Sequence, residues 1–197
     1  VADTFFETTP LRLSLKDVKI GVNYVIIIST NAGLWGYNIG DTVQFTSLAP
    51  FRVIVSGRIK HFISAFGEHV IAKEVEQALL GALKATDVSV SEFTVAPQIA
   101  PAEGLPFHEW FIEFENPPKD FKVFAAHIDA ELQHQNSYYL DLIQGKVLQP
   151  LKITQVKKGG FQDYMKTIGK LGGQNKTPRL SNDRKIADIL TKNNSGN

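Results

Sequence analysis

The hydrophobic pattern changes its period near residue 57, and this change limits the folds that the chain can adopt. Before it, apolar and β-branched residues form short runs at 24–30, 42–46 and 51–57, which are typical of strands. The first run is unbroken, so it predicts a buried strand. Residues 1–56 are therefore expected to form a small β-rich unit with too few elements to close a core alone.

After this point the pattern alternates between helices and strands. Residues 88–97 form a predicted strand whose phase slips at Glu92–Phe93, and residues 107–115 alternate apolar and acidic side chains as a half-buried strand does. Glu68 is expected to favour the start of the next helix through the helix dipole. The order predicts an α+β fold, in which helices flank a small mixed, largely antiparallel sheet that follows the β-rich segment. The other predicted elements are helices at 71–85, 121–132, 159–169 and 183–190 and a strand at 151–156.

Composition excludes several kinds of site and partner. The 197 residues contain no cysteine, which excludes disulfides, thiolate catalysis and cysteine-ligated metals. The five histidines show no metal-ligand spacing, so no protein-held metal is predicted. The net charge is +1, so neither nucleic acid nor a membrane surface is expected as a partner. Without a secretion signal or an apolar run of ~20 residues, the protein is expected to be cytoplasmic.

Charge is distributed unevenly along the chain. Residues 146–197 carry 11 Lys or Arg against 3 Asp, whereas residues 1–145 carry 10 against 17 Asp or Glu. A basic end of this kind can face phosphates, the acidic part of the same molecule, or solvent alone. The sequence leaves these three alternatives open.

The stretch GYNIGD, Gly36 to Asp41, places a glycine and a carboxylate beside a predicted strand. Gly40 before Asp41 is a common turn signal. A carboxylate at a strand edge can also accept two hydrogen bonds from a vicinal diol, such as a ribose. Both interpretations fit the residues.

Two basic stretches follow. Gly57 permits backbone rearrangement, and the cations Arg58 and Lys60 come directly after it, which suits a phosphate-bearing ligand reached by a moving element. A charged loop between strand and helix is the alternative. The glycine-rich residues 169–185 include Lys176, which could neutralise charge developing on a phosphate or carboxylate, or could belong to a basic tail.

Taken in order, these motifs resemble the adenylate-forming enzyme superfamily, which includes acyl-coenzyme A synthetases and luciferases. The closer resemblance is to the Gretchen Hagen (auxin-responsive) acyl-acid amido synthetases, and it covers essentially the whole chain. STNAGLWGYNIGD, residues 29–41, is similar to that family's Thr-x-Ala-Gly-Leu-Tyr-x-Tyr-x-x-Gly-Asp segment. HEWFIEFE, residues 108–115, and GGQNKTPRLSNDR, residues 172–184, resemble the forms of its bacterial members.

The resemblance implies a nucleotide site in the first part of the chain. Asp41 would bind both ribose hydroxyls of ATP and of an acyl-adenylate, and Arg58 would approach the same ribose. Tyr37 and Gly40, from the same segment as Asp41, are assigned to nucleotide binding with them.

The resemblance also implies that the chain is the C-terminal part of a longer, bacterial-type protein. Residues 1–56 would end a large N-terminal domain, and residues 57–197 would form a mobile C-terminal domain. Gly57 to Lys60 would be the hinge between them. The missing N-terminal domain is therefore an expected partner.

The implied activity is that of a ligase. The intact protein would activate a small carboxylic acid with ATP and Mg²⁺ and then join it to an amino acid. Lys176 would be the catalytic lysine, with Lys170 as a neighbouring alternative, and the fragment alone would be inactive. Two other functions stay open: an acyl-coenzyme A ligase, and a non-enzymatic α+β interaction domain whose basic tail binds an acidic partner.

Overall fold

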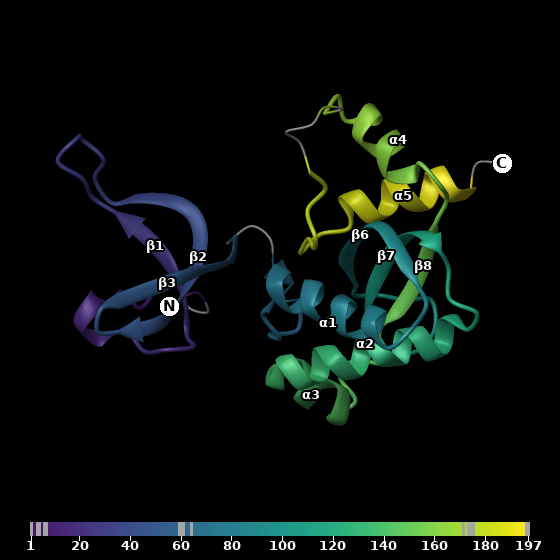
Figure 1. Cartoon of the computed structure of the whole chain (residues 1–197), viewed down its shortest axis with the longest axis horizontal. Helices are drawn as coiled ribbons and strands as arrows, with labels where there is room; N and C mark the ends of the chain where they lie inside the picture. Colours follow the sequence, from purple (N-terminus) through teal and green to yellow (C-terminus); the bar gives the residue numbers. More distant parts are fainter. Residues whose placement is uncertain are drawn as a thin grey trace. The chain divides into compact units, whose positions relative to one another are not determined.

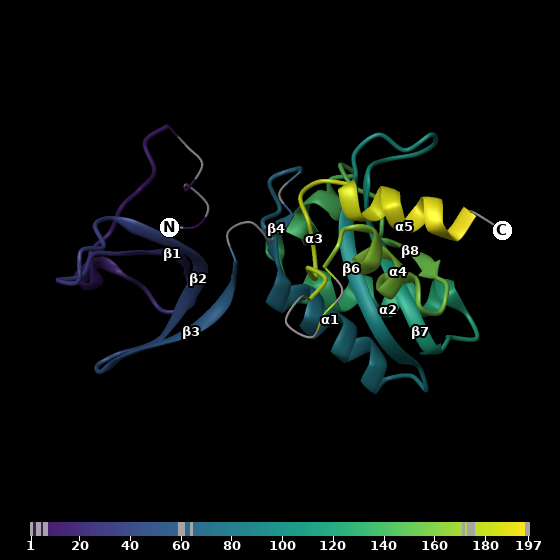
Figure 2. The ribbon, with the colours of Figure 1, turned by 90° about the horizontal axis from the view of Figure 1, so that it is seen from above.

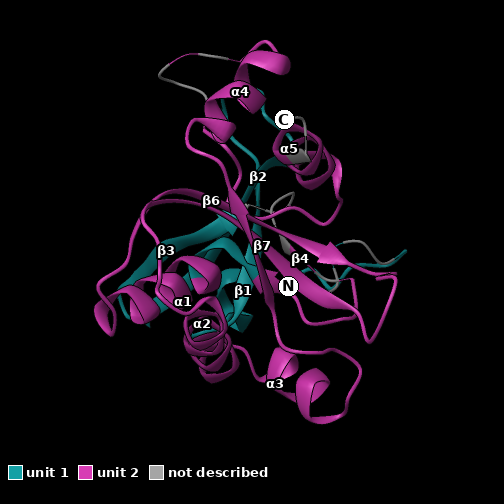
Figure 3. Ribbon diagram, turned by 90° about the vertical axis from the view of Figure 1, so that its right-hand side faces the viewer, with its two compact units in different colours: residues 1–62, 71–73 teal, residues 63–70, 74–197 magenta. Residues whose placement is uncertain are grey.

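The computed structural model divides into two compact units, which Figure 3 colours separately. Unit 1 comprises residues 1–62 and 71–73, and unit 2 comprises residues 63–70 and 74–197. The structure describes residues 2, 5, 8–58, 62–63, 65–170, 172 and 176–195.

Unit 1 contains a three-stranded antiparallel sheet in the order β1-β2-β3 (Figure 1). Its elements are the 3₁₀ turn η1 (Leu15–Asp17), β1 (Asn23–Ile28), β2 (Tyr37–Leu48) and β3 (Phe51–Arg58). All three strands were predicted from the apolar runs.

The prediction that β1 is a buried strand is wrong for this chain. Only Tyr24 of the strand is buried, and Ile27 is 49% exposed. Tyr24, Val43 and Phe45 form a small core cluster. Within the described residues no α-helix lies wholly in unit 1, so most of the apolar side chains of the sheet have no second layer to pack against.

Unit 2 is a three-layer arrangement around the sheet β6-β7-β8. β7 pairs antiparallel with β6 and parallel with β8. α1, α2 and α3 lie on one side of the sheet and α4 and α5 on the other, and Figure 2 shows α4 and α5 over the same face (Figures 1 and 2). The elements are β4 (Phe62–Ile63), which pairs with β5 (Val70–Ile71), α1 (Ala72–Lys84), β6 (Ser89–Gln98), β7 (Phe107–Asn116), α2 (Phe121–Gln135), α3 (Ser137–Gln144), β8 (Lys152–Val156), α4 (Gly160–Thr167) and α5 (Lys185–Ser195).

The central strand β7 is buried on both faces. Phe111 belongs to the core cluster with α4 and α5, while the ring of Phe114 meets the rings of Phe121 and Phe124 from α2. The prediction of a half-buried strand is therefore wrong. The acidic residues of the alternating pattern find partners inside the fold: Glu113 is buried, and Glu109 pairs with Arg184.

The α+β prediction is confirmed, with differences in detail. Strand β6 is irregular, but its register shifts lie on both sides of Val90, and the ladder is regular at Glu92–Phe93, where the phase slip was predicted. The sequence did not predict α3, which starts directly after α2 because Asn136 ends one helix and caps the next. No helix in the described part of the chain has the length and apolar character needed to cross a membrane.

Candidate functional site

Residues 41 and 58 stand opposite each other in the sheet of unit 1. Asp41 lies in β2 and Arg58 ends β3, and the two are register partners. Thr42 is paired with Gly57 in the same way. The structure therefore brings together Asp41, Arg58 and Gly57, which the sequence assigned to the nucleotide and the hinge.

A bulge creates this pairing. Thr42 stands opposite Gly57 and Val43 stands opposite Val55, so Ser56 is an extra residue in β3. In an uninterrupted ladder Gly57 would stand opposite Asp41, and Arg58 would be out of register with it. The Ser56 hydroxyl donates a hydrogen bond to the Thr42 hydroxyl across 3.1 Å, and both side chains are buried.

Gly40 and Asp41 do not form a hairpin turn. They lie within β2, where Val25 pairs with Thr42 and Ile27 with Asn38, so three residues of β2 stand against one of β1. Gly40 has φ +82°, and its N–H donates to the Asn38 side chain at 2.8 Å. The backbone at residue 40 thus favours glycine because of this irregularity in the strand, not because of a chain reversal.

Two of the other predicted residues, Tyr37 and Lys60, are not part of this pairing, and Gly57 does not have the geometry that requires glycine. Tyr37 is the first residue of β2, half-exposed, opposite Ile28. Lys60 lies outside the described residues. Gly57 does not have a positive φ, and a Cβ there would meet only the Thr42 hydroxyl at 3.4 Å. In this conformation, neither its φ nor its surroundings require glycine at position 57.

The two candidate lysines both lie in unit 2, but their backbones differ. Gly169, at φ +68°, and Lys170 close the end of α4, with N–H groups that donate to the carbonyls of Lys166 and Met165. This is the Schellman pattern, so the backbone of Lys170 is part of a helix cap. Lys176 is exposed and precedes Thr177, which is buried.

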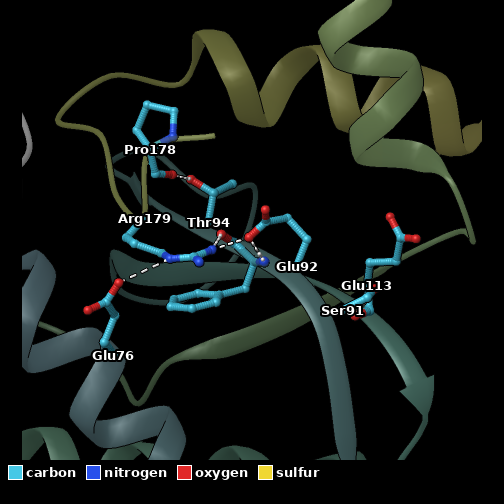
Figure 4. Close-up of polar contacts among 8 residues, drawn as sticks. Glu76, Ser91, Glu92, Thr94, Glu113, Pro178 and Arg179 are labelled. Atoms are coloured by element: carbon cyan, nitrogen blue, oxygen red, sulfur yellow. Dashed lines mark hydrogen bonds and ion pairs between the residues drawn. The ribbon is translucent and has the colours of Figure 1, made fainter. Parts of the chain in front are cut away.

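The arginines of the basic stretch pair with the acidic part of the same molecule. Arg179 binds Glu76 of α1 and Glu92 of β6 (Figure 4). Arg184 binds Glu109 of β7 at 2.8 Å. For these two arginines the alternative that holds is pairing with acidic residues of the same molecule. Their charges are therefore already partnered and are less available to a ligand.

A buried polar group escaped prediction from the sequence. Glu68 does not stand at the helix start as expected, since α1 begins at Ala72 and Glu74 is the acid of its first turn. Glu68 is fully buried, and its carboxylate lies 2.8 Å from His108 Nε2. Asn136 donates to the Glu68 carbonyl at 3.0 Å. The contact joins residues 40 positions apart, so no local pattern could reveal it.

Burial and hydrogen bonding shift the pKa of Glu68 in opposite directions. Burial by itself raises the pKa of the carboxyl, but the hydrogen bond and charge of His108 and the backbone N–H of Phe66 outweigh it. The pKa of Glu68 is therefore held below its ordinary value of 4.5. On the same side of the sheet, burial and then the charge of Asp129 raise the pKa of Tyr139 well above 10.0.

Among the described residues, no group of three or more His, Asp or Glu side chains could hold a metal ion.

Comparison with known proteins identifies the family. The GH3 family central domain matches residues 3–58, and the GH3 family C-terminal domain matches residues 73–185. The chain belongs to the GH3 family. The resemblance seen in the sequence motifs is thereby confirmed.

The GH3 relatives are similar along most of this chain. It is 29% identical over 196 residues to the indole-3-acetic acid-amido synthetase GH3.6 of Arabidopsis thaliana, covering 90% of this chain and 31% of that protein. Jasmonoyl--L-amino acid synthetase GH3.5 of Oryza sativa is 26% identical over 200 residues, covering 96% and 34%. The chain spans about a third of the length of the curated relatives it matches.

A solved structure shows the same fold. The GH3.15 acyl acid amido synthetase superposes with a TM-score of 0.71 at 23% sequence identity, covering 93% of this chain and 35% of that one. The predicted α+β architecture is thus found in an experimental structure.

Proposed function

We propose that this chain is the C-terminal part of an ATP-dependent acyl-acid amido synthetase. In the first step a carboxylate oxygen would attack the α-phosphorus of ATP, giving an acyl-adenylate and pyrophosphate. In the second the amine of an amino acid would attack the acyl carbon, and AMP would leave as the amide forms. The acid and the amino acid stay open.

The pairing of residues 41 and 58 carries this proposal. It lies in the segment that matches the GH3 central domain, and two strands and a bulge place the two residues opposite each other. Asp41 would accept hydrogen bonds from both ribose hydroxyls, with Arg58 opposite it, Gly40 next to it, and Tyr37 at the start of the same strand. An acidic and a basic residue type at facing positions of one strand pair suit a polar, charged ligand.

Residues 1–56 are proposed to end a larger domain, and residues 57–197 to form the domain that moves. Trp35 is 91% exposed and Val55 68% exposed, and both belong to the segment matched by the central domain. Apolar side chains exposed in such numbers mark a surface for another part of a protein. The proposed partner is the remaining two thirds of a GH3 polypeptide, since the relatives are about three times as long as this chain.

Gly57 to Lys60 is the proposed hinge. The conformation described here does not need glycine at 57, so the requirement would arise in a second conformation. Gly57→Ala should leave the stability of this chain nearly unchanged but slow the second half-reaction of the intact enzyme. Equal amide-forming rates in both proteins would exclude the hinge.

Lys176 is proposed to neutralise the charge that develops at phosphorus during adenylation. Mg²⁺ would be held mainly by the phosphates of ATP, where it would offset their charge.

The test is carboxylate-dependent exchange of labelled pyrophosphate into ATP, measured on the natural polypeptide that contains this chain. Asp41→Ala should lower ATP affinity about 10-fold or more, since a group bonded to both ribose hydroxyls is lost. Asp17→Ala is the matched control, because Asp17 is an exposed carboxylate of unit 1 outside β2 and β3. No exchange with any acid would refute the proposal. Formation of a coenzyme A thioester instead of an amide would assign the intact protein to the acyl-coenzyme A ligases.

A further inference from the structure

We propose that Arg179 is a positioning residue for Lys176, which it fixes to helix α1 and strand β6. The inference rests on the proposed function, because it gives Lys176 the adenylation role. It adds that this lysine is delivered by the whole of unit 2 and not by an independently moving loop.

The backbone after Lys176 is docked along the edge of β6. Thr94 Oγ1 donates to the Pro178 carbonyl at 2.7 Å (Figure 4). The Val95 N–H donates to the Arg179 carbonyl at 2.9 Å, and the Ser181 N–H donates to the Val95 carbonyl at 2.9 Å. The segment therefore adds a short parallel bridge to an otherwise open sheet edge.

The side chain of Arg179 ties this segment to two elements at once. Its Nε lies 3.1 Å from Glu76 of α1, and its Nη1 binds Glu92 of β6. The guanidinium also lies over the Phe93 ring, 4.8 Å from the ring centre. Figure 4 shows the guanidinium between the two carboxylates. A planar group with several fixed donors can hold two acceptors in one geometry, which a lysine ammonium does less well.

These contacts limit where Lys176 can go. Lys176 lies three positions before Arg179, so its Cα stays within about 11 Å of the Arg179 Cα. Each ion pair is partly exposed, since the Arg179 side chain is 33% accessible, and such pairs add little stability individually. Their combined effect is on position. Glu76 and Glu92 both belong to unit 2, so a turn of unit 2 at the hinge would carry Lys176 with it.

The first test uses this chain and trypsin under native conditions. A protease must take up several residues beyond the bond that it cuts, so cleavage of the Lys176–Thr177 bond needs the docked segment that begins at Pro178 to leave β6, and its rate reports that local opening. In Arg179→Gln we expect the bond to be cut about 10-fold faster than in the wild type.

Arg184→Gln is the matched control for this test. Arg184 also pairs internally, with Glu109 and the Pro97 carbonyl, but it follows the docked segment. It should leave the Lys176–Thr177 cleavage rate unchanged. Equal rates in Arg179→Gln and the wild type would overturn the inference, whatever the activity of the protein.

The second test measures pyrophosphate exchange in the full polypeptide. Arg179→Gln should lower kcat about 10- to 100-fold, as expected for a displaced catalytic group, with KM for ATP within about twofold. Arg179→Lys should restore little of the rate although it restores the charge, whereas Arg184→Gln should keep it.

The outcomes separate the two proposals. A wild type that exchanges with no acid refutes the proposed function, while the trypsin result still decides whether Arg179 holds the segment. A wild-type rate in Arg179→Gln, beside a large loss in Lys176→Ala, overturns only the positioning role. A full rate in Lys176→Ala removes the lysine's role and this inference together.

Discussion

The two units of the molecule differ in how completely each buries its own sheet. In the described part of unit 1, the buried hydrophobic side chains are Tyr24, Val43 and Phe45. In unit 2, helices cover both faces of the sheet, and Trp110, Phe111 and Ile112 of β7 are fully buried. Unit 2 therefore has a hydrophobic core with helices on both sides of its sheet, whereas the described part of unit 1 is a sheet without a covering helix layer.

This difference explains where the apolar surface lies. The larger exposed hydrophobic side chains of unit 1 lie on all three strands, on the segment before β1 and between β1 and β2. A sheet without a covering layer leaves its apolar residues in water, at a loss of about 25 cal/mol for each Å² that stays unburied. Those exposed beyond 45% are Leu11, Leu15, Ile20, Ile27, Trp35, Tyr37, Phe51, Val53 and Val55.

The largest expected effect concerns separation of the units. A chain of residues 63–197 should fold cooperatively, whereas residues 1–58 alone should not form a stable sheet, because three buried hydrophobic residues cannot offset chain entropy. Dispersion of amide resonances in NMR spectra of the two pieces measures this. A well-dispersed spectrum for residues 1–58 as a monomer would contradict the comparison.

Truncation of an apolar side chain should lower the free energy of unfolding much more in unit 2 than in unit 1. Phe111→Ala removes a fully buried ring between the helix layers of unit 2 and should destabilise that unit by about 3–5 kcal/mol. Val55→Ala, at a side chain 68% exposed, should change stability by less than about 0.5 kcal/mol. Urea titrations followed by circular dichroism measure both, and similar costs would show that the apolar face of unit 1 is covered.

Asn136→Ala should destabilise unit 2 by about 1–3 kcal/mol. The side chain caps α3 by accepting from the Tyr139 N–H and also donates to Glu68 and Glu74, so its loss leaves buried partners unpaired. Asp120→Ala, which removes the exposed cap of α2, is the control, at about 1 kcal/mol. A smaller loss of stability in Asn136→Ala than in Asp120→Ala would mean that the buried hydrogen bonds of Asn136 do not add to the stability of unit 2.

The smallest effect is a pH dependence confined to unit 2. The folded-state pKa of Glu68 is below 4.5, so its ionised form stabilises the fold above that pH. This contribution is lost as pH falls from 4.5 through the lower, folded-state value. The unfolding free energy of the wild type should therefore fall more steeply below pH 4.5 than that of Glu68→Gln. Urea midpoints between neutral and acidic pH measure this, and parallel profiles would refute it.

Much of the fold was predictable because its signals are local. Helical period located α1 and α2, and apolar, β-branched runs located the three strands of unit 1. An irregularity in β6 was also predicted, but at Glu92–Phe93, just after the register shifts that the structure has. Burial was harder to predict. The acidic residues of β7 indicated a solvent-exposed face. In the structure, however, the Glu113 carboxylate accepts hydrogen bonds from the Gly159 and Phe161 N–H groups at the start of α4. These partners lie 46 and 48 residues away along the chain, so the local sequence pattern cannot reveal them.

The candidate site was predictable only in its residue types. The motifs pointed to Asp41 and Arg58, but their pairing depends on Ser56 being extra in β3, which no spacing rule indicated. Arg179 was counted as one of several basic residues. Its role became visible only when Glu76 and Glu92 were brought beside it by folding.

The extra residue at position 56 also affects how this family should be aligned. A homologue that lacks the equivalent of Ser56 would form a regular ladder at this point, with the glycine still opposite Thr42 and the arginine still opposite the aspartate. A one-residue gap at this position therefore does not by itself mean that the pairing of residues 41 and 58 is lost. An alignment of the strand should allow that gap and keep the Gly-Arg pair in its own columns.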